Sequence, residues 1–341
     1  MPDLKRHAFH ALLSVATALA VFHLPAAAQP VTAAGEVPTR PAASRMPAAF
    51  ADRSASGEAL VTAWFGLLAL EPAGAGPDNS PGEVAAERAI IRPYLDPAFQ
   101  IQRASGERYN VNDYVPADIA TFTVSGVLTT EPADGVKVVR YTVSTPGATI
   151  PDRAVFLSDD ARFRLNVFRW SAERGHWAMV SIANFNTPTA AICNAAPVPW
   201  TAMPVSTSAA DAELGRSLVD QWRAATMGRP SEAIVSDALM IQLADGQGWP
   251  NEAGIPIMWS PAQSYEAADI VTSRHGDLLV VSFVAVVSGL RVDARAYGSE
   301  RQPRLLTYLR NAEGKWELIA LANFVTPATI PTGMNCVAKT P

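Results

Sequence analysis

The chain has 341 residues, of which 49% are hydrophobic and 17% are charged, and its formal net charge is −5 at pH 7. This composition is typical of a globular protein and excludes a disordered one, and the length is sufficient for two domains of ordinary size. The sequence holds no run of Lys and Arg, which argues against a nucleic-acid partner.

Residues 1–28 have the pattern of a secretory signal peptide. Lys5 and Arg6 form a short basic region, an apolar stretch follows at 8–24, and residues 26–28 are alanines that suit cleavage. A retained membrane anchor is the alternative, although the apolar stretch is short for a bilayer span. The sequence therefore predicts a periplasmic or secreted protein with no membrane span after signal removal.

The remainder divides into a linker and two similar halves. Residues 29–53 are rich in Ala and Pro without a sustained period, which predicts a flexible linker. We expect a first domain over 54–194, a second linker over 195–208 and a second domain over 209–338.

Each half opens with an amphipathic helix. Ser208 and Asp211, three residues apart, form a capping-box pattern ahead of the second helix. The segments LVTAW and LVDQW align at helical spacing, so Trp64 and Trp222 occupy the same point of the two helices. We expect both indoles to pack against the sheet that follows.

Several β-rich runs come next in each half. Both halves carry the pattern IQ-x-A-x-G, and both end on nearly the same strand, SIANFNTP (181–188) and ALANFVTP (320–327). The turns SAERG and NAEG join the last two runs of each half and predict hairpins. The fold class predicted is α+β, with two tandem cone-shaped α+β barrels, each a curved antiparallel sheet wrapped on N-terminal helices.

These landmarks resemble the nuclear transport factor 2-like superfamily, and more closely its bacterial SnoaL-like branch. The resemblance implies a pocket under the opening helix of each half, chemistry without a cofactor, and association through the outer face of the sheet. We therefore expect an intramolecular pseudo-dimer of the two halves, and a homo-oligomer is also allowed. The residues that carry the resemblance are Asp96-Pro97-Ala98-Phe99, Gly106, Gly175-His176-Trp177, Ala183-Asn184-Phe185, Gly246, Gly314-Lys315-Trp316 and Ala322-Asn323-Phe324.

The candidate catalytic residues are Tyr109, Asp113 and Asp118, in the segment YNVNDYVPAD. A tyrosine donor with a carboxylate base suits enolisation or dehydration inside an apolar cavity. The alternative is that the two aspartates cap the start of a surface helix.

The candidate ligand-binding residues are aromatic or carboxamide side chains. Relatives often carry a His near the end of the closing strand, whereas this chain has an Asn, which hydrogen-bonds a ligand but does not titrate. Each Asn could instead cap the end of its strand. Arg164 and Arg304 occupy matched positions. They either face inward, where they would bind an anion, or lie on the outer face of the sheet or at the interface between the two copies. The ligand-binding candidates are Trp64, Tyr114, Asn184, Trp222, Trp259, Tyr265 and Asn323.

The remaining candidates are histidines and cysteines. His176 and His275 are predicted to be solvent-facing turn residues rather than bases or metal ligands. Cys193 and Cys336 follow the two closing strands, so either one disulfide joins the two tails or both thiols are unpaired. No metal-spaced cluster, phosphate loop or dinucleotide fingerprint occurs, and we expect neither a metal nor a cofactor.

Three functions are compatible with this sequence. The first is an exported protein that binds a small apolar or aromatic molecule. The second is a cofactor-free isomerase, dehydratase or C–C lyase acting on a small hydrophobic substrate. The third is a non-catalytic protein-association module. The absence of a shared acid–base pair favours the first.

Overall fold

The computed structural model describes two separate stretches of the chain, with gaps. Among the described residues, no helix is long and apolar enough to cross a membrane. The predicted signal peptide, Asp118, Cys193 and Cys336 lie outside the described residues. The described residues are 46–69, 85, 88–103, 107–114, 116, 119, 121–146, 148–150, 155–156 and 161–185 in the first half, and 208–232, 234–243, 248–250, 259–260, 262–289, 291–292, 295–296 and 301–324 in the second.

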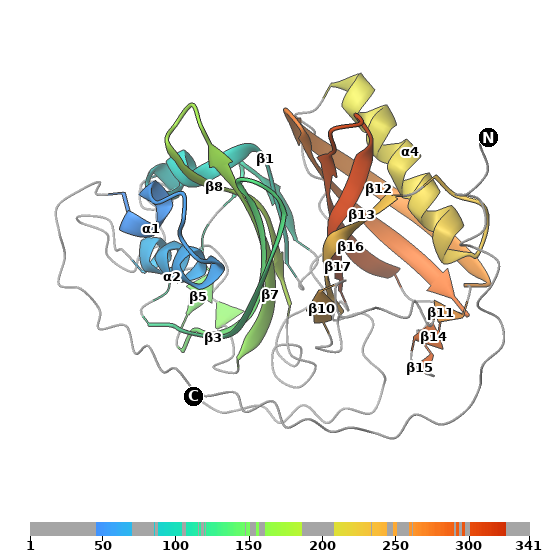
Figure 1. The fold of residues 1–341 in the computed structure, drawn as a ribbon. Coiled ribbons are helices and arrows are strands. Elements are labelled where there is room, and N and C mark those ends of the chain that lie inside the picture. The colour runs from blue at the N-terminus through green and yellow to red at the C-terminus, as the bar shows by residue number, and fades with distance from the viewer. Residues whose placement is uncertain are drawn as a thin grey trace, which may run out of the picture. The chain divides into compact units, whose positions relative to one another are not determined.

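The first half begins with helices and continues as a sheet (Figure 1). The short helix α1 lies within the stretch predicted to be a linker, and its Phe50 is fully buried. The opening helix α2 forms as predicted, and the Ser56 hydroxyl caps it by accepting the N–H of Ala59. The elements are α1 (Ala48–Ala51), α2 (Gly57–Leu68), the 3₁₀ turn η1 (Arg92–Tyr94), β1 (Leu95–Arg103), β2 (Arg108–Asn110), β3 (Thr123–Ala133), β4 (Val136–Ser144), β5 (Thr149–Ile150), β6 (Val155–Phe156), β7 (Arg162–Ser171) and β8 (His176–Asn184).

The second half repeats this order of elements. The N-cap of its helix is Ser208, whose hydroxyl accepts the N–H of Asp211 at 3.2 Å, so the predicted cap is confirmed. The elements are α4 (Ala209–Thr226), β9 (Ile234–Gln242), β10 (Gly248–Pro250), β11 (Trp259–Ser260), β12 (Ser264–His275), β13 (Leu278–Ser288), β14 (Arg291–Val292), β15 (Arg295–Ala296), β16 (Arg301–Arg310) and β17 (Trp316–Asn323).

The two main sheets have the same strand order. The first runs β2-β1-β8-β7-β4-β3 and the second runs β10-β9-β17-β16-β13-β12, so each strand has an equivalent in the other half. The predicted hairpins β7–β8 and β16–β17 are present. The prediction of antiparallel sheets is wrong, because β1 pairs with β8 and β9 pairs with β17 in parallel. The chain therefore has an α+β fold with two domains, each built on a mixed sheet.

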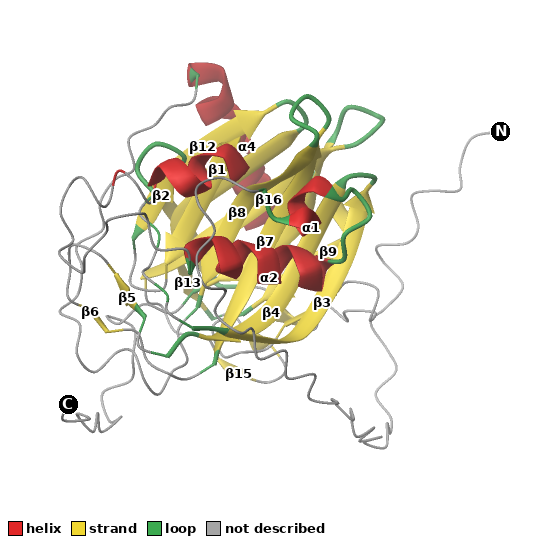
Figure 2. Ribbon diagram, turned by 90° about the vertical axis from the view of Figure 1, so that its left-hand side faces the viewer, coloured by secondary structure: helices red, strands yellow, loops and turns green. Residues whose placement is uncertain are grey.

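Each opening helix lies across one face of its own sheet, which we call the helix face (Figure 2). Both helices approach a strand at a glycine, Gly57 in α2 and Gly215 in α4. A Cβ atom on Gly57 would lie 2.1 Å from Thr129 Oγ1, and one on Gly215 would lie 1.9 Å from Thr272 Oγ1. Glycine is required at both positions because the helix and the strand are too close for a methyl group.

We expect Gly215→Ala to destabilise the protein by about 1–3 kcal/mol, because the new methyl group would overlap Thr272. Helix propensity alone predicts the opposite sign, a gain of about 1 kcal/mol. Gly66 is the matched control: it also lies in a helix, and nothing lies within 4 Å of its Cβ position. Urea denaturation should show Gly66→Ala at or above wild-type stability, and equal effects of the two changes would contradict the close approach.

The buried apolar side chains form three clusters. One lies between α2 and the first sheet and contains Trp64, and a second lies between α4 and the second sheet and contains Trp222. The third combines residues of both sheets from the faces opposite the helices. Within it the rings of Phe185 and Phe324 stack, with centroids 4.4 Å apart and planes 7° from parallel.

Polar contacts accompany the third cluster. The Gln100 side-chain amide donates to Ser273 Oγ and to the Val280 carbonyl oxygen, both at 3.0 Å. The hydroxyls of Ser181 and Thr307 lie 2.9 Å apart. These hydrogen bonds join specific residues of the two sheets, so they define which residues lie opposite one another more strictly than apolar packing alone.

Candidate functional site

A row of polar side chains crosses the helix face of the first sheet. Tyr141 of β4 lies opposite Arg164 of β7, Arg164 lies opposite Asn184 of β8, and Asn184 lies opposite Arg103 of β1. Side chains alternate between the two faces of a strand, and the strand neighbours of Arg164 and Asn184 pack into the third cluster instead. Four neighbouring strands therefore place a polar side chain at the same level on the helix face.

Three residues predicted from the sequence meet at one end of this row. The rings of Trp64 and Tyr114 stack, with centroids 6.4 Å apart. The Arg103 guanidinium lies 5.0 Å from the ring centroid of Tyr109 and 6.0 Å from that of Tyr114. The sequence thus identified a group of aromatic side chains that the fold brings together.

Glu107 belongs to the same group and was not predicted. Tyr109 Oη donates to Glu107 Oε1 at 2.8 Å, and Arg103 Nη1 lies 3.5 Å from Glu107 Oε2. Glu107 is 2% exposed. A carboxylate buried in this way needs a cation and a hydroxyl donor, and the two neighbours supply both.

Asn166 lies on the helix face, two residues from Arg164 in β7, and was also not predicted. Its amide Nδ2 donates to Tyr141 Oη at 3.0 Å, and both side chains are at most 1% exposed. Its Oδ1 is buried and accepts no hydrogen bond from any described residue. A buried acceptor without a donor is costly, so this position is suited to a donor from a bound molecule.

Burial changes the ionisation of two side chains in the row. It raises the pKa of Tyr141 above its ordinary value, so the phenol stays protonated at neutral pH. Burial, together with repulsion from Arg162, lowers the pKa of Arg164 to about 9. The guanidinium is therefore charged at pH 7.

The predicted acids do not join this group among the described residues. Asp113 lies in a turn directly after β2 rather than at the start of a helix, so its predicted role as a helix cap is wrong. Its backbone N–H donates to Asn110 Oδ1 at 3.3 Å, and its carbonyl oxygen accepts from Arg88. No described contact joins its carboxylate to Tyr109. Asp118 lies outside the described residues.

In the second half, Tyr265, Trp222 and Arg304 lie together on the helix face. Burial raises the pKa of Tyr265, and Arg304 and Trp222 are among its polar neighbours. Asn323 ends β17, as Asn184 ends β8, and its Oδ1 is buried without a partner among the described residues. Trp259 lies in β11, opposite Val292, and nothing is described of its side chain.

The second half keeps two of the four positions of the polar row, Arg304 and Asn323. Phe283 replaces Tyr141 opposite the conserved arginine position, and Leu306 replaces Asn166 two residues beyond it. The position of Arg103 is taken by Leu243, which packs in the apolar cluster. The two halves therefore share a fold, but among the described residues the first presents four polar side chains in this row and the second presents two.

Arg164 and Arg304 both face inward, so their alternative placement on the outer face is wrong. Each guanidinium Nη1 donates to the carbonyl oxygen of the preceding residue, Phe163 at 2.9 Å and Pro303 at 3.0 Å. Both residues are at least nine-tenths buried. The sequence left this choice open because both faces of these strands are buried.

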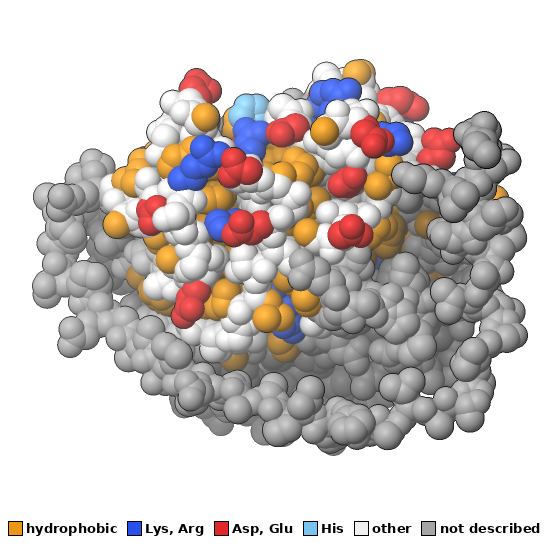
Figure 3. Space-filling model, in the orientation of Figure 1, with side chains coloured by type: hydrophobic (Ala, Val, Ile, Leu, Met, Phe, Trp, Pro, Cys, Tyr) orange, Lys and Arg blue, Asp and Glu red, His pale blue; other side chains and the backbone are white. Residues whose placement is uncertain are grey.

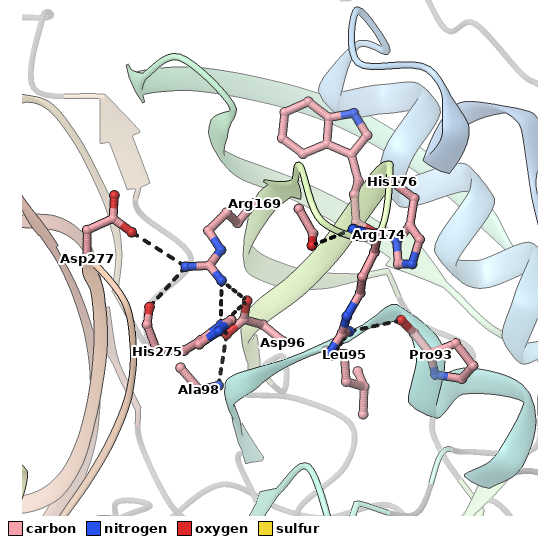
Figure 4. A network of polar contacts seen from close by, with 11 residues as sticks. Pro93, Leu95, Asp96, Ala98, Arg169, Arg174, His176, His275 and Asp277 are labelled. Atoms are coloured by element: carbon pink, nitrogen blue, oxygen red, sulfur yellow. Dashed lines mark hydrogen bonds and ion pairs between the residues drawn. The ribbon is translucent and has the colours of Figure 1, made fainter.

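The histidines are not free turn residues, which corrects that prediction. His176 is 5% exposed, and its Nδ1 lies 2.8 Å from the Trp177 carbonyl oxygen. His275 Nδ1 lies 3.1 and 3.2 Å from the two carboxylate oxygens of Asp96, which also pairs with Arg169 (Figure 4). In this cluster the carboxylate is partnered on all sides, so we assign it a structural role.

The described residues offer no metal site, and charges of both signs are mixed on the face drawn in Figure 3. No group of three or more His, Cys, Asp or Glu within the described ranges could hold a metal ion. On the face drawn in Figure 3, acidic and basic side chains are interspersed among apolar ones.

Comparison with protein-family models and with curated proteins finds no match. Solved structures similar to this chain include an NTF2-like protein from Cytophaga hutchinsonii, at 16% identity over 34% of this chain and 93% of that chain, with a TM-score of 0.26. A ketosteroid isomerase, described as putative, from Shewanella frigidimarina is 13% identical over 32% and 93% of the two chains, with a TM-score of 0.25. The association domain of C. elegans CaMKII is 10% identical over 33% and 93%, with a TM-score of 0.26. These sequence identities and TM-scores are too low to indicate a ligand or an activity for this chain. Any such proposal must be based on its own side chains.

Proposed function

We propose that the chain is an exported tandem NTF2-like protein that binds a small, largely apolar molecule at the helix face of its first half. The observation that carries this proposal is the buried polar row on this helix face, where Asn166 Oδ1 accepts no hydrogen bond from a described residue. The row is flanked by Trp64, Tyr114 and Phe99, which offer aromatic contacts. Apolar walls with a few oriented polar groups are the usual composition of a small-molecule site.

The second half serves, in this proposal, as a structural partner. Its matching helix face carries leucine and phenylalanine where the first half carries Asn166, Arg103 and Tyr141. The third cluster, with residues of both sheets, supports an intramolecular pseudo-dimer of the two halves. Binding and assembly would then be divided between two copies of one domain.

Native mass spectrometry of the protein purified from its own host tests the binding proposal. We expect a retained molecule of small mass that dissociates on unfolding. In Asn166→Leu, which copies the second half, the retained molecule should be lost, whereas Leu306→Ala should leave it in place. Cell fractionation with intact-mass measurement tests export, and cleavage after Ala28 would give a mature chain that begins at Gln29.

A second function, cofactor-free catalysis, is favoured by one contact. The Tyr109 hydroxyl and the Glu107 carboxylate lie 2.8 Å apart in a buried setting, which suits a donor and a base acting on one substrate. Glu107→Gln should then abolish turnover of the identified ligand, and Asp113→Asn is the matched test of the acid in the following turn. Unchanged turnover in Glu107→Gln would remove that carboxylate from the chemistry.

A further inference from the structure

The Arg164 guanidinium is buried without a carboxylate partner. The residue is 6% exposed, and its Nη1 donates to the carbonyl oxygens of Phe163 and Phe185, both at 2.9 Å. Among the described residues, these are its only hydrogen bonds, and no carboxylate lies within 4.0 Å of it. The N–H groups of Nη2 and Nε therefore have no acceptor among the described residues. A buried cation with only partial compensation is costly to the folded protein, and an acceptor anion would offset that cost.

The equivalent arginine of the second half has side-chain partners. Arg304 Nη2 donates to Gln302 Oε1 at 2.6 Å, and Tyr265 is a further neighbour. In the first half, the position of Gln302 is taken by Arg162, whose charge repels Arg164 instead of accepting a hydrogen bond from it. The guanidinium of Arg304 thus has a side-chain acceptor within the protein, whereas that of Arg164 has none among the described residues.

A second donor lies beside Arg164. Asn184 is its opposite residue on β8 and points to the same face, and its amide makes no hydrogen bond among the described residues. A carboxylate accepts two N–H groups of one guanidinium side by side and retains lone pairs for an amide N–H. On the other side of Asn184 lies Arg103 of β1, whose guanidinium lies over the ring of Tyr114.

We propose that the site in the first half recognises a carboxylate on an aromatic or apolar ligand, with Arg164 and Asn184 as its receptors. This inference rests on the proposed function and adds the charge of the ligand to it. The guanidinium must carry its proton to bind the anion. Since the pKa of Arg164 without ligand is about 9, affinity for a carboxylate should be constant from pH 7 to 8 and fall above that value.

Isothermal titration calorimetry with acid and amide pairs tests the inference. The probes are benzoate with benzamide, phenylacetate with phenylacetamide, and hexanoate with hexanamide. At pH 7.5 we expect at least one acid to bind about tenfold or more tightly than its own amide, the effect of one charge-assisted hydrogen bond or more. Arg164→Gln should remove this preference, and Arg164→Lys should keep a reduced one.

Arg304→Gln is the matched control, since it removes the equivalent guanidinium from the second half and should leave the preference for the acid unchanged. Circular dichroism melting of each variant shows that it is folded. The inference is overturned if no acid binds, if acids and amides bind equally, or if the preference survives Arg164→Gln. A neutral molecule retained in native mass spectrometry would overturn it while the proposed function stands. If no molecule is retained and no added ligand binds, the inference and the proposed function are both overturned.

Discussion

Replacing Phe324 with alanine is expected to lower the free energy of unfolding by about 3–5 kcal/mol. The side chain is fully buried, and its ring stacks on Phe185 with centroids 4.4 Å apart. The cluster around it includes residues of both sheets, so the void left by the ring cannot be filled by the movement of one side chain. Urea denaturation followed by tryptophan fluorescence measures the loss.

Two comparisons make this result specific. Leu128 is 42% exposed, and Leu128→Ala should change the free energy of unfolding by about 0.5 kcal/mol or less. A double-mutant cycle with Phe185→Ala should give a coupling energy of about 0.5–1.5 kcal/mol for the ring pair. A loss below about 1 kcal/mol for Phe324→Ala, with no coupling, would show that the rings are not packed in solution and would count against the pseudo-dimer.

Local signals in the sequence predicted the elements well. Both opening helices begin at a serine cap, and the two polar turns join hairpins, because caps and turns depend on residues a few positions apart. The parallel pairing of β1 with β8 was missed. That pairing joins segments about eighty residues apart, as in Ile101 opposite Ile182, and no local pattern specifies the direction of such a partner.

The site was predictable only in part, for a related reason. Trp64 was identified on the opening helix, and Tyr109 and Tyr114 were identified after the Gly turn, and these three do meet. In RFRLNVF (162–168) polar residues alternate with apolar ones, a pattern that normally indicates one solvent-exposed and one buried face of the strand. Here both faces are buried, one beneath α2 and one in the third cluster. Alternation therefore could not show whether Arg164 and Asn166 lie on the helix face or in the third cluster.

The second large effect is expected at Asp96, whose side chain is 1% exposed. It accepts the N–H of Ala98 at 2.8 Å and pairs with Arg169 Nη2 at 2.9 Å, and the His275 imidazole lies against it (Figure 4). Asp96→Ala would remove the nearer and buried carboxylate from the Arg169 guanidinium, which is 15% exposed, and leave it only the exposed Asp277 at 3.5 Å. We expect a loss of about 3 kcal/mol, at the lower end of the range for a broken buried pair. The low end applies because Arg169 keeps its hydrogen bond to the His275 carbonyl oxygen at 2.9 Å.

An exposed ion pair of this chain provides the matched control. Asp134 lies 2.6 Å from Arg53, with 87% and 55% of the two side chains exposed, so Asp134→Ala should cost about 1 kcal/mol or less. Asp96→Asn retains the acceptor for Ala98 and removes only the charge, so it separates the backbone hydrogen bond from the ion pair. If Asp96→Ala costs no more than Asp134→Ala, water or Asp277 must compensate the Arg169 guanidinium, because a cation that stayed buried could not lose its nearer carboxylate at so small a cost.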